Sequence, residues 1–318
     1  MRILFITSTR IGDAVLSSGL LSHLIEISDN PEVTIACGAE AAPLFEAVPG
    51  LVQIIPIIKK KRGGHWLALW QQCVGKRWDV VVDLRASAIA WLLLTRRRLV
   101  LRPDDGPVHR VEAIGGLADT AMPPPPRMWT TPEHDVAAAK LWVDGAPVLA
   151  LAPTANWRGK QWQAERFAGL ALALTSADGI LPGAAIAIFG APAERSAAEP
   201  VIAALPADRR IDLVGKLDLL TACAALRRAT FFVGNDSALM HMAAAVGVPT
   251  LGLFGPSREA HYAPYGPRCA VQRTAQSYDT LIGAPGYDHR TTDTLMDSLS
   301  VDMAEAAARK LWAQCEGV

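Results

Sequence analysis

The sequence has none of the short motifs that mark the common nucleotide-dependent and metal-dependent enzymes. No G-x-G-x-x-G follows the first predicted strand and no G-x-x-x-x-G-K-[ST] occurs, which argues against a dehydrogenase or a P-loop enzyme. No H-x-x-x-H pair or acidic cluster announces a metal, so we predict neither a metal site nor a cofactor. The five cysteines are scattered without a C-x-x-C pair, which fits buried thiols in a reducing compartment.

Long apolar runs and an excess of one charge are also missing. The most apolar window, residues 86–95, is about half the length needed to cross a bilayer, and no secretory signal is visible. Lysine plus arginine and aspartate plus glutamate both number 31, so no net field points to nucleic-acid binding. We therefore expect a cytoplasmic protein that is soluble or at most peripheral on the inner membrane, with no nucleic-acid partner.

What is present is an alternation of apolar, strand-like runs and alanine-rich helical runs. Strands are expected at residues 2–8, 32–36, 52–57, 80–83, 98–101, 148–152, 185–189, 211–213 and 250–254, with a further strand beginning at Phe231. Helices are expected at residues 13–27, 41–47, 133–143, 164–176, 193–204, 217–227 and 238–246. Apolar runs such as ILFI and VVVDL indicate parallel strands that are covered on both faces.

Two α/β series of similar length follow one another along the 318 residues. The proline-rich segment 122–132 cannot be helix interior and predicts a stiff surface stretch. We place the domain boundary near Gly145. The sequence thus predicts an α/β fold with two Rossmann-like domains, residues 1–145 and 146–318, that face each other across a cleft.

The segment 231–255, FFVGNDSALMHMAAAVGVPTLGLFG, is the most informative part of the chain. It reads as a strand, a polar turn at residues 234–237, a short helix and a second strand, with Ser237 or Asp236 capping the helix. A helix N-terminus that small residues leave open is a place to hold a phosphate. The alternative is an ordinary crossover with a capped helix, in which His241 only packs.

Three loops of the second half should converge, because the carboxyl ends of parallel strands share one edge. They are residues 154–160, 190–194 and 234–241. Lys160 could contact phosphate oxygens, or it could be an ordinary surface lysine. Glu194 could bond a ribose hydroxyl or a base, or it could be a first-turn helix acid. In the first half, Asp13 lies where the first strand enters a helix. It is either a general base or a structural residue, namely an N-cap or a first-turn acid that complements the helix dipole.

Taken together, these segments resemble glycosyltransferase family 9, the ADP-heptose:lipopolysaccharide heptosyltransferases. The features that match are R-I-G-D-A-V-L at residues 10–16, K-x-W at residues 160–162 and N-D-S-A-L-M-H followed by F-G-P-S at residues 235–257. The resemblance implies a GT-B fold and a metal-independent, inverting transfer from ADP-heptose to the lipid-linked inner core of lipopolysaccharide.

The resemblance also implies roles for particular residues. Asp13 matches the proposed catalytic base on an acceptor-binding N-terminal domain. The donor would be bound by the C-terminal domain, through Thr154, Asn156, Lys160, Glu194, Asp236, Ser237, Ala238, Leu239 and His241. Where members of the family often have hydroxyl residues before the lysine, this chain has Ala155 and Asn156.

Two basic clusters stand out in the first half of this chain of zero net charge. They are Lys59, Lys60, Lys61 and Arg62, and Arg96, Arg97 and Arg98. Trp66 and Trp70 follow the first cluster at helical spacing, so the clusters could meet a phosphorylated acceptor or anionic lipid. The alternative is a solvated surface. Other functions that remain open are a glycosyltransferase or UDP-sugar epimerase using another nucleotide sugar, and a non-catalytic nucleotide-binding module.

Overall fold

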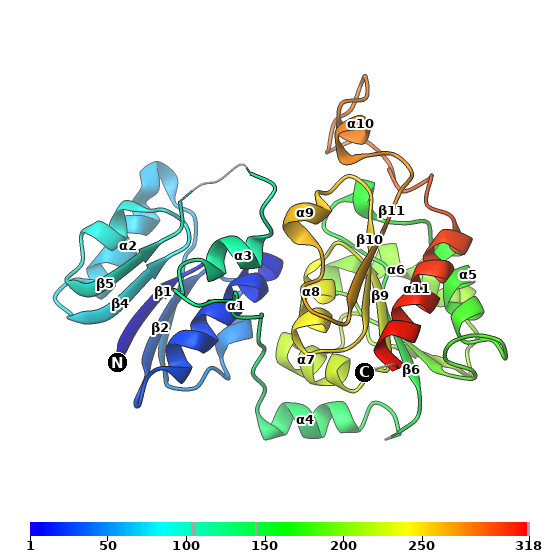
Figure 1. Cartoon of the computed structure of the whole chain (residues 1–318), viewed down its shortest axis with the longest axis horizontal. Helices are drawn as coiled ribbons and strands as arrows, with labels where there is room; N and C mark the ends of the chain where they lie inside the picture. The colour runs from blue at the N-terminus through cyan, green and yellow to red at the C-terminus, as the bar shows by residue number, and fades with distance from the viewer. Residues whose placement is uncertain (103–105, 144, 317–318) are drawn as a thin grey trace. The chain divides into compact units, whose positions relative to one another are not determined.

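The computed structural model describes residues 1–102, 106–143 and 145–316 (Figure 1). The chain divides into two compact units, residues 1–131 and residues 132–318. Each unit is built on one parallel sheet, as the uninterrupted apolar runs predict. The α/β fold class is therefore confirmed.

The first unit has a five-stranded sheet in the order β3-β2-β1-β4-β5. Its strands are β1 (Arg2–Ile6), β2 (Glu32–Cys37), β3 (Leu51–Pro56), β4 (Trp78–Asp83) and β5 (Thr95–Val100). Its helices are α1 (Ile11–Glu26), α2 (Gly64–Cys73) and α3 (Arg110–Gly115), with 3-10 turns η1 (Ala42–Phe45), η2 (Lys61–Gly63) and η3 (Ala88–Trp91). The helix expected at residues 41–47 is thus only the turn η1, which has a proline in its first turn.

Apolar side chains of β1 and β4 form the core of this unit. Leu4, Ile6 and Val81 pack with Leu69 of α2 and with Ile89 of η3. α1 and α3 contact each other and lie on the other side of the sheet (Figure 1). The sheet is therefore a rigid base that presents the loops at its carboxyl edge.

The proline-rich segment is not simply a surface stretch, because it packs along α1. A Cβ atom on Gly19 of α1 would lie 2.1 Å from the carbonyl oxygen of Pro124, so only glycine allows this approach. Arg127 fixes the end of the segment, since its backbone nitrogen donates to Ser18 Oγ at 2.8 Å and its guanidinium pairs with Glu26 at 2.9 Å.

The second unit has a six-stranded sheet in the order β11-β10-β9-β6-β7-β8. Its strands are β6 (Val148–Ala152), β7 (Ala185–Ile188), β8 (Arg210–Asp212), β9 (Phe231–Asn235), β10 (Thr250–Phe254) and β11 (Cys269–Arg273). Its helices are α4 (Pro132–Ala139), α5 (Ala164–Leu174), α6 (Arg195–Ala204), α7 (Leu219–Arg227), α8 (Ala238–Ala245), α9 (Glu259–Tyr262), α10 (Tyr278–Ile282) and α11 (Val301–Glu316), with η4 (Arg158–Lys160) and η5 (Pro192–Glu194).

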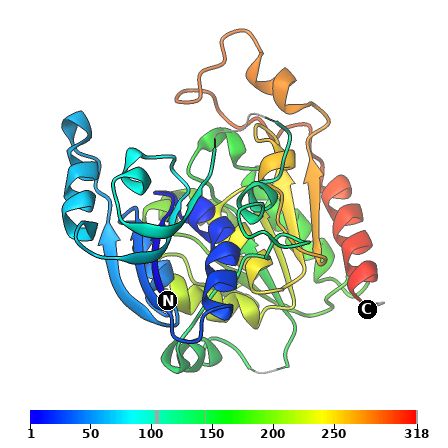
Figure 2. The same cartoon turned by 60° about the vertical axis from the view of Figure 1, so that its left-hand side comes forward.

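Helices cover both faces of this sheet (Figure 1). Phe167 of α5 and Leu311 of α11 pack on Leu149 and Val233 of the central strands. Figure 2 shows α11 in red alongside β11 in orange, and these two elements are in contact. The central strands β6, β9 and β10 are completely buried, so they hold the loops that follow them in fixed positions.

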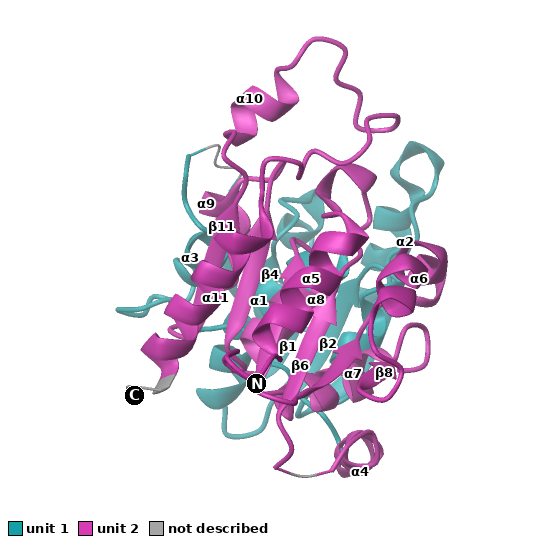
Figure 3. Ribbon diagram, turned by 90° about the vertical axis from the view of Figure 1, so that its right-hand side faces the viewer, with its two compact units in different colours: residues 1–131 teal, residues 132–318 magenta. Residues whose placement is uncertain are grey.

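The division between the units lies at Thr131 and Pro132, earlier than the boundary expected near Gly145 (Figure 3). The difference is α4, which packs against α7 of the second unit. Arg227 of α7 pairs with Asp135 of α4 at 3.3 Å, and His134 lies 3.8 Å from Asp218, the residue that caps α7. The Arg227–Asp135 ion pair and the helix contact attach residues 132–139 to the second unit.

Candidate functional site

The sheet order brings three of the predicted loops together in the second unit. β9, β6 and β7 are neighbours, so the segments that follow them at residues 236–241, 153–160 and 190–194 leave the same edge of the sheet. The segment after β10, residues 255–257, lies beside them because β10 pairs with β9. This edge is the candidate donor site.

Lys160 and Asp236 form the central charged pair of this edge. Lys160 Nζ lies 2.5 Å from Asp236 Oδ2, and His241 Nε2 lies 3.8 Å from Asp236 Oδ1. The Asp236 and His241 side chains are buried, whereas that of Lys160 is partly open to solvent. The edge thus offers one cation that can move toward a phosphate and one carboxylate that can accept hydrogen bonds from sugar hydroxyls.

Asn235, which the sequence did not single out, fixes the loop that carries Lys160. Its side chain is fully buried and donates to the carbonyl of Pro153 at 2.8 Å, while the backbone nitrogen of Trp162 donates to its Oδ1 at 3.3 Å. Trp162 is anchored in turn by its indole nitrogen, which donates to Leu299 O at 3.0 Å. One amide therefore joins the end of β9 to both ends of the Lys160 loop.

The predicted side-chain cap of α8 is not formed. Ser237 stands at the cap position without a side-chain hydrogen bond to the helix, and the Asp236 carboxylate turns to Lys160 instead. Because neither side chain satisfies them, the first backbone N–H groups of α8, at Ala238 and Leu239, are left for an anion. The absence of a side-chain cap thus favours the interpretation of residues 234–241 as a phosphate site over their interpretation as an ordinary crossover with a capped helix.

Three buried hydroxyl groups follow the three neighbouring strands β6, β9 and β10. Within the described part of the chain, the side-chain oxygens of Thr154, Ser237 and Ser257 have no hydrogen-bond partner. A buried hydroxyl without a partner costs about 1–3 kcal/mol. Three of them along one sheet edge favour a polar ligand at this site, and Ser257, the last residue of the F-G-P-S motif, is a site residue to which the sequence assigned no role.

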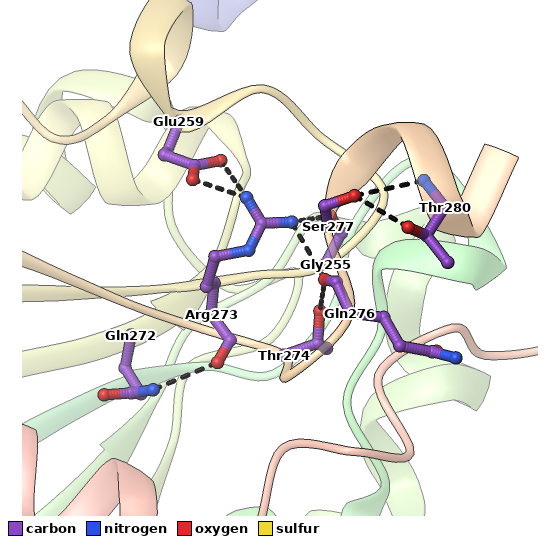
Figure 4. Close-up of polar contacts among 8 residues, drawn as sticks. All are labelled: Gly255, Glu259, Gln272, Arg273, Thr274, Gln276, Ser277 and Thr280. Atoms are coloured by element: carbon purple, nitrogen blue, oxygen red, sulfur yellow. Dashed lines mark hydrogen bonds and ion pairs between the residues drawn. The ribbon is translucent and has the colours of Figure 1, made fainter.

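Arg273, at the end of β11, positions the loop that carries Ser257 (Figure 4). Its guanidinium pairs with both carboxylate oxygens of Glu259 and donates to the carbonyl oxygens of Gly255 and Gln276 at 3.2 Å each. Thr274 Oγ1 also donates to Gln276 O, at 2.9 Å (Figure 4). The fork of one arginine therefore holds the segments before and after β11.

The remaining predicted donor residues lie at the margin of this edge. Glu194 accepts a hydrogen bond from the backbone nitrogen of Ala191 at 2.8 Å through Oε2, as a first-turn acid would. That contact leaves Oε1 for a ligand. Asn156 is exposed on the loop before Lys160, while Gln161 ties the same loop together by donating to Ala155 O at 2.7 Å.

In the first unit, Asp13 lies in the first turn of α1, directly after β1. The N-cap position is Arg10 and no side chain caps the helix, so Asp13 is not the N-cap but an acid in the first turn, which is the other form of the structural alternative. Ser8 Oγ donates to Asp13 Oδ2 at a long 3.4 Å. The carboxylate is thus held at the carboxyl edge of the sheet, beside the helix N-terminus, where a negative charge is favoured.

The loop after β4 lies next to that of Asp13, because β4 pairs with β1. Asp83 is completely buried there and accepts hydrogen bonds from the backbone nitrogens of Arg85 and Ser87 at 2.9 Å and from Ser87 Oγ at 2.6 Å. Burial raises the pKa of Asp83 in spite of these hydrogen bonds. The turn is tight enough to place Ala86 at a φ of 49°, a left-handed conformation.

The three arginines at residues 96–98 do not form the single cluster that the sequence suggested. All three lie within β5, so Arg97 points to the opposite face from Arg96 and Arg98. Arg98 is used internally, since it donates to the carbonyl oxygens of Ala90 and Leu93 and stacks on Trp91, 4.9 Å from the ring centre. Of the three, only Arg96 remains a largely exposed charge on the α2 side.

No group of His, Cys, Asp and Glu side chains that could hold a metal ion occurs within the described ranges. None of the helices described there is long and apolar enough to span a membrane.

Comparisons with known proteins agree with this architecture. A structure described as a glycosyltransferase family 9 protein from Veillonella parvula superposes with a TM-score of 0.79 at 20% identity, covering 98% of this chain and 97% of that one. The structure of the Escherichia coli ADP-heptose lipopolysaccharide heptosyltransferase II gives a TM-score of 0.74 at 21% identity, covering 99% of this chain and all of that one. These similarities establish the GT-B fold of glycosyltransferases.

The family follows from the sequence match. The model of glycosyltransferase family 9 (heptosyltransferase) matches residues 93–280, and the chain belongs to this family. Lipooligosaccharide heptosyltransferase 2 of Haemophilus influenzae is 28% identical over 202 residues, which are 62% of this chain and 56% of that protein.

Proposed function

We propose that this glycosyltransferase moves a heptose from ADP-heptose to the inner core of lipopolysaccharide, with inversion and without a metal. The observation that carries the proposal is the edge of the second sheet, where Lys160, Asp236 and three buried hydroxyls surround an uncapped helix N-terminus. The relatives with this fold support the donor, because the Escherichia coli enzyme is named for ADP-heptose and lipopolysaccharide.

In this proposal the second unit binds the donor. Lys160 leaves Asp236 for the diphosphate, and the first N–H groups of α8 with Ser237 share the same charge. Asp236 then accepts hydrogen bonds from the hydroxyl groups of the sugar, with His241 beside it. Glu194 and Asn156 contact the nucleoside of the donor. A diphosphate held in this way leaves more readily, because cationic and N–H groups stabilise the charge that develops on it.

The first unit supplies the base. The acceptor hydroxyl oxygen attacks the anomeric carbon, the bond from that carbon to the diphosphate oxygen breaks, and the hydroxyl proton passes to Asp13. A carboxylate is a weak base for an alcohol, and it suffices when proton transfer is late and the sugar already resembles an oxocarbenium ion. The products are the extended acceptor and ADP.

The acceptor in this proposal is lipid-linked, so we place the enzyme in the cytoplasm, peripherally on the inner membrane. The exposed cluster Lys59–Arg62 precedes α2 in the unit that carries Asp13. Phosphate groups of the acceptor are its proposed ligands. Arg96 is a second exposed cation of the same unit.

A thermal-shift panel with ADP, UDP, GDP, CMP and NAD tests the donor site. At about 100 times Kd a ligand adds roughly 2.7 kcal/mol, or a few degrees for units of this size. We expect a selective shift with ADP that is lost in Lys160→Ala and kept in Lys310→Ala, which removes an exposed lysine of α11. A UDP-selective shift would instead favour another transferase or an epimerase. ADP binding without sugar transfer to any acceptor would indicate a non-catalytic module.

A further inference from the structure

The first unit exposes a short apolar segment at the end of η3. Trp91, Leu92 and Leu94 are 67%, 60% and 68% exposed, while Leu93 between them is buried in the core. Water-exposed apolar residues are common singly, but three in four consecutive positions are a costly arrangement in a soluble surface. The buried Leu93 fixes the segment, so its neighbours are held outward.

The segment is continuous with the basic part of the same unit. Trp70 of α2 donates from its indole nitrogen to Leu92 O at 3.3 Å, and Trp66, one turn earlier in α2, stacks on Arg85 at 5.2 Å. α2 itself begins directly after the exposed cluster Lys59–Arg62 and exposes Leu67 on its surface. The apolar segment therefore adjoins the C-terminal half of α2, and the basic cluster precedes the N-terminal end of the same helix.

Charge in this part of the chain is mostly positive. Residues 57–98 include ten lysines and arginines but only two acidic residues, in a chain that has 31 of each sign overall. Of the two acidic residues, Asp83 is buried and Asp79 pairs with Arg96 at 3.4 Å. Exposed tryptophan and leucine side chains surrounded by lysines and arginines are typical of a surface that binds an anionic bilayer. The apolar side chains enter the headgroup region, where an indole ring is favoured, and the cations are attracted to the lipid phosphates.

We propose that Trp91, Leu92 and Leu94 insert into the headgroup layer of an anionic phospholipid membrane, with Lys59–Arg62, Arg85 and Arg96 binding lipid phosphates. This proposal rests on the proposed function only for the reason why the enzyme would bind a membrane, which is to bring Asp13 to a lipid-linked acceptor. The docking itself requires neither donor nor acceptor. Each inserted side chain adds apolar burial, and each cation near the surface adds electrostatic attraction.

Vesicle sedimentation tests the proposal with the full-length protein and no nucleotide or lipopolysaccharide present. The wild type should bind vesicles of phosphatidylcholine mixed with phosphatidylglycerol and bind pure phosphatidylcholine poorly. We expect Trp91→Ser/Leu92→Gln/Leu94→Gln to lower the partition coefficient at least about tenfold, since about 1.4 kcal/mol of lost insertion is tenfold. Ile27→Gln/Val52→Gln is the matched control, because it removes two similarly exposed apolar residues of the same unit, one at the C-cap of α1 and one in β3.

Trp91 contacts Arg98, so the milder variant Leu92→Gln/Leu94→Gln, which keeps that contact, guards against misfolding and should still lose several-fold. Unchanged binding of both variants would overturn the proposal. Equal binding of the wild type to pure phosphatidylcholine would also overturn it. So would a wild-type dimer in solution that becomes monomeric in the triple variant, since the segment would then be covered by a second copy of the chain. Turnover of a lipid-free acceptor in solution is measured separately, so a failure of the proposed transferase activity leaves the membrane result readable.

Discussion

Lys160 Nζ lies 2.5 Å from Asp236 Oδ2, although the two residues are 76 positions apart in the sequence. The pair forms because β6 and β9 are neighbours and because Asn235 fixes the loop between Pro153 and Trp162. An ion pair at the sheet edge neutralises both groups while no donor is bound. A donor diphosphate can then exchange for the aspartate as the partner of the lysine.

The pair predicts that Lys160→Ala destabilises the second unit, because Asp236 is left buried with an unpaired charge. We expect a loss of about 2 kcal/mol in the free energy of unfolding, less than for a fully buried pair because Lys160 is partly exposed. Adding Asp236→Asn should recover most of that stability, while affinity for ADP stays at least tenfold below wild type. Urea unfolding and calorimetric titration measure the two effects. Recovery of ADP affinity in the double variant would contradict the role of Lys160.

The buried hydroxyls predict an unusual separation of stability from binding. Thr154→Val and Ser257→Ala should leave the free protein as stable as wild type or slightly more stable, because a partnerless hydroxyl is removed. Affinity for the nucleotide sugar should fall by about two- to tenfold, the value of a typical hydrogen bond. Ser176→Ala is a control, since that hydroxyl already donates to Ala173 O at 2.9 Å. Lower stability with unchanged affinity would show that the hydroxyls serve the fold alone.

Asp13→Asn keeps the shape of the side chain but removes the base. Turnover should fall by orders of magnitude while ADP affinity changes little, because Asp13 belongs to the first unit and the donor residues to the second. Single-turnover kinetics with saturating donor separate the two effects. Asp29→Asn, at an exposed acid of the same unit, is the matched control. Near-normal turnover of Asp13→Asn would remove the base assignment.

The thiols predict an alkaline loss of stability. Burial raises the pKa of Cys37 and of Cys223 from 9.0 to about 12, so the folded protein favours the neutral thiols. A raised folded-state pKa stabilises the protein below pH 9, and this contribution is lost as the pH rises from 9 toward 12, at about 1.4 kcal/mol per pH unit for each thiol. Iodoacetamide at pH 8 should therefore leave both residues unmodified until urea is added. Rapid labelling of either cysteine in the folded protein would contradict this account.

The parts of the fold that the sequence predicts best are the buried strands. The bounds expected for β6 and β10 agree with the structure, because a short apolar run between polar turns is typical of a strand covered on both faces. The helix α2 was not predicted as an element, because it begins with Gly64, its N-cap is Gly63, which has no side chain, and four cations precede that glycine. The helical spacing of Trp66 and Trp70, which is visible in the sequence, is the local signal of this helix.

Local motifs and strand order predict which loops form the site, but they do not predict the contacts between the side chains of those loops. The loops that carry Lys160, Glu194 and Asp236 follow from parallel strands, whereas the pairing of Lys160 with Asp236 is a tertiary contact. Ser257 was seen as the last residue of the F-G-P-S motif but was given no role, because its burial without a partner is a tertiary feature. The arginine cluster was misplaced because β5 begins at Thr95, three residues before the expected start, and this puts alternate arginines on opposite faces.

The most direct test of the account is transfer itself. Purified protein is incubated with ADP-heptose and heptose-deficient lipopolysaccharide in the presence of EDTA, and the acceptor is examined by mass spectrometry while ADP release is followed. We expect one added heptose for each ADP released, no effect of EDTA, and no product with Asp13→Asn. An acceptor that stays unmodified with ADP-heptose but gains a sugar from another nucleotide donor would contradict it.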